Sequence, residues 1–313
     1  MQTLRIVSCL LIFCGPLIPT EVACDPSDPQ LELLFSLAWG GKNGPQLSNR
    51  VKSSLTQGPT SVALGPQGKI WILDNQANRL LAYDNSGCLL EVVALTPGHR
   101  DDLAVGHDGS LALLARHTAK IEILGKNGRP KKTIELAAHL GPPRRIGFTQ
   151  EIQVENAHGE RFALGRPDDL KPLRQVLFNR RQGPIGSLFD CAVSVANGKV
   201  SLYRWGQPSK LTAERRPADH IIDLELDGVA SARLVSSCSS RGMLVEVQRL
   251  EDGPVVKVSK EIVFVQDWRP ATTWQLPGSS RLQQSCLFAQ RGPEVIIVQA
   301  LDQGLHFFRW RLP

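Results

Sequence analysis

The sequence predicts an all-β protein built from repeated small sheets. Two stretches match at an offset of 41 residues without a gap, so that Gly65 and Gly68 in the first correspond to Gly106 and Gly109 in the second. Each stretch has room for four short strands joined by turns. A period near 40 residues with several strands per unit is typical of propeller blades. With an N-terminal lead and one loop-rich region set aside, the length predicts a β-propeller with six blades of four antiparallel strands.

The first repeat shows how one unit is expected to fold. Gly65-Pro66-Gln67-Gly68 is a turn, because proline presets φ and glycine accepts a positive φ. Asp74 to Asn78 and Asp84 to Gly87 are expected to form two further turns. The four strands between these turns are expected at Ser61 to Leu64, Lys69 to Leu73, Arg79 to Tyr83 and Leu89 to Leu95.

Later units keep the pattern less regularly. Pro142 to Arg166 is expected to hold the third blade, and the polar stretch Arg166 to Gln182 is expected to be a loop or a short helix. Leu31 to Trp39 is an apolar strand candidate far from its own unit. We expect it to pair with the C-terminal unit, since closing the ring removes exposed sheet edges.

The N-terminus has the character of a secretory signal. Arg5 supplies a positive charge, and Ile6 to Ile18 is an uncharged, mostly apolar run too short to span a membrane comfortably. The predicted organisation is a signal peptide over residues 1–23, an N-terminal lead with the closing strand over 24–57, and the propeller over 58–313. The chain is therefore expected to be exported: periplasmic, secreted or lipid-anchored at the cell envelope.

The cysteines leave two questions open. Val22-Ala23-Cys24 resembles the end of a bacterial lipobox, so Cys24 is a lipidation candidate, and simple cleavage near this point is the alternative. Cys88 follows a turn and is expected to be free or exposed. A disulfide, if present, would draw on Cys191, Cys238 and Cys286, and the sequence does not choose the pair.

The net charge of +6 favours anionic partners. The candidate patch is Lys131, Lys132, Arg144 and Arg145. For an exported monomer the expected partner is a protein or an anionic envelope component, with no nucleic acid and with membrane contact only through a possible lipid anchor. The alternative is an ordinary solvated surface.

The first unit resembles an NHL repeat. Asp74, Asn78 and Arg79 match that family's pattern residue by residue, whereas the second unit departs from it with Ala115, Ala119 and Lys120. The resemblance implies a propeller that serves mostly as a binding platform. It also implies that the Asp and the Arg pair within the blade, so that their role is structural.

Catalytic motifs are absent from the sequence. None of the seven histidines lies two or four residues from another, and no GxSxG, Walker or GxGxxG motif occurs. Trp71, Trp205 and Trp310 fall in strand candidates and are expected in the core between blades. The sequence thus predicts a non-enzymatic binding or scaffold module with no cofactor. The alternative is a metal-dependent propeller enzyme, resembling lactonases or lyases, with a site in the axial channel.

Overall fold

The computed structural model describes most of the strands and fewer of the connections. The described residues are 31–46, 58–148, 150–157, 161–170, 177–179, 191–196, 199–204, 219–224, 226, 229–239, 242–251, 257–266, 269–276, 287–291, 294–301 and 303–311. The predicted signal peptide, Cys24 and Cys286 lie outside these ranges. The domain boundaries and the processing of the N-terminus therefore stay predictions.

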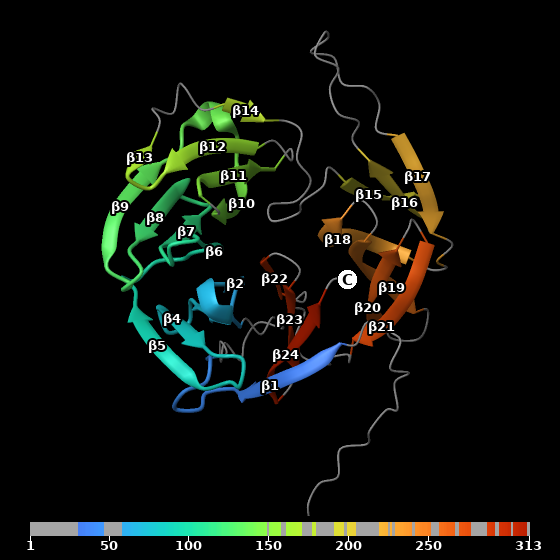
Figure 1. Cartoon of the computed structure of the whole chain (residues 1–313), viewed down its shortest axis with the longest axis horizontal. Coiled ribbons are helices and arrows are strands. Elements are labelled where there is room, and N and C mark those ends of the chain that lie inside the picture. Colours follow the sequence, from blue (N-terminus) through green and yellow to red (C-terminus); the bar gives the residue numbers. More distant parts are fainter. Residues whose placement is uncertain are drawn as a thin grey trace, which may run out of the picture.

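Within the described residues the strands pair into six antiparallel sheets (Figure 1). The first three sheets contain β2 (Ser61–Leu64), β3 (Ile70–Asp74), β4 (Arg79–Tyr83) and β5 (Leu89–Ala94); β6 (Asp102–Val105), β7 (Leu111–Ala115), β8 (Lys120–Leu124) and β9 (Pro130–Glu135); and β10 (Pro143–Phe148), β11 (Ile152–Asn156), β12 (Arg161–Arg166), β13 (Asp169–Leu170) and β14 (Leu177–Asn179). The other three contain β15 (Cys191–Ala196), β16 (Lys199–Arg204) and β17 (Asp219–Leu224); β18 (Val229–Ser239), β19 (Gly242–Glu251), β20 (Lys257–Gln266) and β21 (Arg269–Leu276); and β22 (Leu287–Arg291), β23 (Glu294–Leu301) and β24 (Gly304–Arg311) with β1 (Glu32–Ala38).

The sheets follow one another around a ring. The innermost strands β22, β2, β6 and β10 contact each other in that order, and β15 contacts β18 (Figure 1). Apolar side chains fill the spaces between neighbouring sheets. Trp71 lies between the β2–β5 and β6–β9 sheets, and Trp310 lies between the β18–β21 and β22–β24 sheets, both almost fully buried. Sequential sheets packed face to face around an axis are a β-propeller. Trp71 and Trp310 occupy the inter-sheet core as predicted, and Trp205 lies outside the described residues.

The N-terminal strand closes the ring. β1 pairs antiparallel with β24 over Glu32 to Ala38, as the sequence predicted. Arg309 strengthens this pairing, because its guanidinium lies 2.6 Å from the Glu32 carboxylate. The last sheet thus takes one strand from the start of the chain and three from its end.

Two details of the predicted architecture are wrong. Four strands were expected in every blade, but among the described residues the β15–β17 sheet has three and the β10–β14 sheet has five. The stretch Arg166 to Gln182 was expected to be a loop or a short helix, but it contains β13 and β14. These strands are only two and three residues long, too short for an alternating apolar pattern to reveal them.

The repeat itself is confirmed. Gly68 and Gly109 occupy equivalent turns in adjacent sheets with φ of 74° and 84°. Ile70 and Leu111, which follow them, are completely buried. Cys88 is free and exposed, as expected from its place after a turn.

The turn between the second and third strands repeats with a strained residue. Asn78 has φ of 48°, and Ala119, its equivalent at the offset of 41, has φ of 50°. The same hydrogen bond is made in both units, from Leu95 N to Asn78 O at 2.7 Å and from Leu136 N to Ala119 O at 2.8 Å. Asparagine tolerates this left-handed conformation, whereas alanine does not.

We expect Ala119→Asn to stabilise the protein by about 0.5–1 kcal/mol, because it relieves this backbone strain. Chemical denaturation of the full chain measures the effect. The reciprocal Asn78→Ala change is the control and should destabilise by a similar amount or more. A less stable Ala119→Asn protein together with an unaffected Asn78→Ala protein would contradict the assignment.

Candidate functional site

Asp74 and Arg79 form an ion pair across the turn that joins β3 to β4. Arg79 Nε lies 3.0 Å from Asp74 Oδ2, and the Asp74 side chain is fully buried while that of Arg79 is 19% exposed. Asp74 also accepts weaker hydrogen bonds from the backbone N–H groups of Ala77 at 3.4 Å and Gln46 at 3.3 Å. The carboxylate therefore holds its own turn and the lead segment together, which is a structural role.

The pair is made through a single nitrogen of Arg79 and is not bidentate. The second arm of the Arg79 guanidinium, Nη2, donates instead to the carbonyl oxygen of Gly44 at 2.7 Å. Nearby, the Tyr83 hydroxyl donates to the carbonyl oxygen of Asn43. Burial raises the pKa of Tyr83 to about 12, against the opposing effect of the Arg79 charge, so this hydroxyl stays protonated as a donor. Arg79 and Tyr83 thus fasten the segment that follows the closing strand onto the β2–β5 sheet.

Asn78 also has a structural role. Its side-chain oxygen accepts a hydrogen bond from Gly98 N at 3.3 Å, in the connection that leads to the next sheet. Together with its positive φ, this contact accounts for an asparagine at the position.

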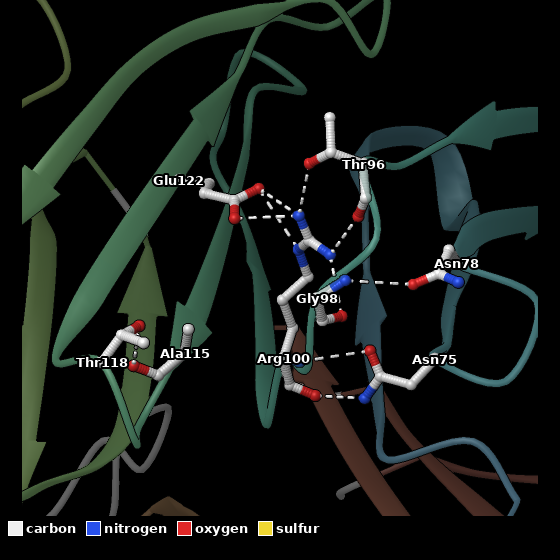
Figure 2. A network of polar contacts seen from close by, with 8 residues as sticks. All are labelled: Asn75, Asn78, Thr96, Gly98, Arg100, Ala115, Thr118 and Glu122. Atoms are coloured by element: carbon white, nitrogen blue, oxygen red, sulfur yellow. Dashed lines mark hydrogen bonds and ion pairs between the residues drawn. The ribbon is translucent and has the colours of Figure 1, made fainter.

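A larger polar network, centred on Arg100, joins the β2–β5 sheet to the β6–β9 sheet (Figure 2). Arg100 is 2% exposed and bonds both carboxylate oxygens of Glu122 through Nε at 3.2 Å and Nη2 at 2.8 and 2.9 Å. Nη1 donates to the carbonyl oxygens of Thr96 at 2.7 Å and Gly98 at 3.0 Å. The backbone of Arg100 bonds the side-chain amide of Asn75 in both directions. Every guanidinium nitrogen has a partner, so the buried charge is compensated within the fold.

Asp102, the first residue of β6, connects three successive inner strands. Its Oδ1 accepts hydrogen bonds from Ser61 Oγ in β2 at 2.7 Å and from Leu103 N at 3.0 Å. Its Oδ2 accepts from Ile146 N in β10 at 2.9 Å. Burial raises the pKa of Asp102, and the hydrogen bonds from Ile146, Ser61 and Leu103 only partly offset this effect.

The raised pKa gives a prediction with a defined sign. Stability contributed by such a group is present below the unfolded pKa, near 3.8, and is lost as the pH rises through the folded pKa. We therefore expect Asp102→Asn to cost more stability at about pH 4 than at about pH 7, as measured by urea denaturation.

Asp84→Asn is the matched control for this prediction. The hydrogen bond from the Ser86 side chain, followed by that from the Cys88 backbone, lowers the pKa of Asp84. Its substitution should therefore show the opposite dependence, costing more at neutral than at acid pH. The same slope for both variants would contradict the assignment to Asp102.

The basic residues predicted to form a patch do not share one edge of a sheet. Lys131 and Lys132 are exposed on β9, the outermost strand of its sheet. Arg144 and Arg145 lie on β10, at the inner edge of the next sheet. The sequence could not place them, because it does not say which strand of a blade faces the axis.

Two of the three predicted disulfide residues lie on strands that the structure describes. Cys191 begins β15, and Cys238 lies near the end of β18 in the neighbouring sheet. Their side chains and all of Cys286 lie outside the described part of the structure, so pairing stays a prediction.

The side chains of Arg291 and His107, which no sequence pattern connects, meet near the axis. Arg291, at the end of β22, donates to His107 Nδ1 at 3.2 Å and to the carbonyl oxygen of Leu64 at 3.4 Å. His107 lies in the exposed turn after β6, as expected, and no sequence signal links it to a residue 184 positions away. At the opposite end of the strands of the β6–β9 sheet, His99 Nε2 lies 3.3 Å from Asp101 Oδ1. The ring centroids of His99 and His117 are 6.1 Å apart.

The described residues lack two features that would bear on function. They contain no cluster of three or more His, Cys, Asp or Glu side chains suited to hold a metal ion. They also contain no helix with the length and apolar character needed to cross a bilayer.

Comparisons with known proteins found similarity in structure alone. No protein-family model matches the chain, and no curated protein does. Solved structures similar to it include a catalytically inactive variant of virginiamycin B lyase from Staphylococcus aureus with quinupristin (13% identity, 91% of this chain, 100% of that chain, TM-score 0.48). U3-55K is similar at 13% identity (90% of this chain, 98% of that chain, TM-score 0.48), and the Swd1 β-propeller domain from Myceliophthora thermophila at 8% (91% of this chain, 100% of that chain, TM-score 0.44). At these identities and TM-scores the neighbours carry no argument about function, and the fold assignment depends on the order and packing of the sheets.

Proposed function

We propose that this chain is a six-bladed, NHL-type β-propeller that acts outside the cytoplasm as a binding or scaffold module for an anionic partner. The signal-like N-terminus supports the location, and the net charge of +6 supports the partner class. Each of the six sheets is taken as one blade.

One observation carries the proposal. The buried charged groups best placed to do chemistry are fully engaged in holding the ring together: Asp74 with Arg79, Arg100 with Glu122, and Asp102 with three donors. A catalytic acid or base must be able to form a hydrogen bond with its substrate. These residues therefore favour a rigid scaffold whose ligand contacts are made by exposed side chains.

The test uses the purified full chain in two measurements. It is used as bait in an extract of the cell envelope of the source organism, and the captured protein is then purified and titrated back onto the chain. Elemental analysis of the same preparation measures bound metal. We expect a captured protein that rebinds at a defined stoichiometry. Stoichiometric metal together with no rebinding partner would contradict the proposal and favour the metal-dependent enzyme.

A further inference from the structure

The side chains of Arg291 and His107 meet at one end of the ring axis. Arg291 ends the inner strand β22, Leu64 ends the inner strand β2, and His107 follows the end of the inner strand β6. Through its bonds to Leu64 and His107, the Arg291 guanidinium spans three successive sheets. Phe148 packs against Gly106, the residue before His107, where a β-carbon would lie 2.9 Å from its ring.

The Arg291 charge has no counter-charge in the part of the chain that the structure describes. Its partners there are a carbonyl oxygen and an imidazole nitrogen, both neutral acceptors. Because guanidinium can only donate, His107 Nδ1 must accept, which places the imidazole proton on Nε2. His107 is exposed and Arg291 partly so. An oxyanion arriving here would find N–H donors on both side chains.

Two lysines extend the positive charge toward the outer strands of the same sheet. Lys126, in the turn between β8 and β9, lies beside Gly109, where a β-carbon would be 3.6 Å from Lys126 Cβ. Lys131 approaches the other side of this turn and acts electrostatically on Asp108. Both lysines are exposed, and the described residues place neither in an ion pair. Arg291, His107, Lys126 and Lys131 are called the basic stripe below.

One acidic residue interrupts the basic stripe. Asp108 is bonded within its own turn, to Ser110 N at 2.9 Å and Ser110 Oγ at 2.7 Å. Burial opposes its ionisation, but the hydrogen bonds from Ser110, together with smaller effects that include the Lys131 charge, lower its pKa, so it is negatively charged at neutral pH. It would repel a compact dianion such as phosphate more strongly than a single carboxylate.

We propose that the basic stripe binds an extended acidic peptide of a partner protein, with one carboxylate on Arg291 and His107 and further carboxylates on Lys126 and Lys131. Arginine suits carboxylates because its planar fork can donate two parallel hydrogen bonds. Separated cations on one side of the ring match negative charges distributed along a chain. This assignment rests on the proposed binding function and names the class of ligand for it.

The experiment titrates the full chain into fluorescently labelled hexaglutamate and follows the anisotropy at low ionic strength. We expect Arg291→Gln to weaken binding about tenfold, and the double change Lys126→Gln with Lys131→Gln to weaken it by a similar factor. Arg116→Gln is the matched control. Arg116 is exposed in the turn between β7 and β8, at the opposite end of these strands, and its change should alter binding less than about twofold.

Three results would overturn the assignment: no binding of hexaglutamate, equal effects of Arg291→Gln and Arg116→Gln, or tighter binding of inorganic phosphate than of hexaglutamate. The last would indicate a small-anion site. If a captured envelope protein binds the Arg291→Gln chain as well as the wild type, the stripe assignment fails while the proposed function stands. If the basic stripe binds hexaglutamate but no partner is captured, the stripe assignment stands while the proposed function fails.

Discussion

Arg100→Met is expected to lower the free energy of unfolding by about 3–5 kcal/mol, the range for breaking a buried ion pair by removing one partner. For a chain of this size that corresponds to a fall of about 5–8 °C in Tm. Methionine keeps the aliphatic part of the side chain, so the loss reflects the polar contacts. Glu122, with its side chain 30% exposed, would be left without its partner, as would the carbonyl oxygens of Thr96 and Gly98.

The control for Arg100 lies on β8, the strand that also carries Glu122. Lys120 pairs with Glu135 at 3.0 Å, but these side chains are 44% and 76% exposed. Lys120→Met should therefore cost only about 0–1 kcal/mol. Urea denaturation of both variants gives the comparison. Equal losses would show that Arg100 is not a buried link between the two sheets.

Asp74→Ala is expected to cost about 3 kcal/mol, at the lower end of the range for a buried pair because Arg79 is 19% exposed and regains some hydration. The change removes the acceptor for Arg79 Nε and weakens the attachment of the lead segment through Gln46. Thermal melting measures the effect, with Glu135→Ala, from the exposed pair, as the control of about 0–1 kcal/mol. An unchanged Tm in Asp74→Ala would contradict the structural role.

The repeat made the β2–β5 and β6–β9 sheets predictable. Glycines at an offset of 41 have strong local meaning, because turns with positive φ select them, and they located the first eight strands of the repeat closely. The closing strand was predictable because an apolar run without its own unit has to cover a sheet edge. Where such turn signals fade, as between Arg166 and Gln182, short strands were missed.

The polar contacts were predictable only where they are local. Asp74 and Arg79 lie five residues apart across one turn, and the sequence pairs them. Arg100 and Glu122 are 22 residues apart, and the one hint was a glutamate among apolar neighbours in a strand. Arg291 and His107 are brought together by closure of the ring, and no local pattern records that contact.

Buried charges hold this propeller together, and we propose that exposed basic side chains bind its ligand. The most direct measurement determines Tm and hexaglutamate affinity for Asp74→Ala and Arg291→Gln in parallel, at a temperature where both are folded. We expect opposite effects of the two changes: Asp74→Ala melts lower and binds normally, and Arg291→Gln melts normally and binds about tenfold more weakly. Normal melting with lost binding in Asp74→Ala would contradict it, because Asp74 would then belong to the binding site.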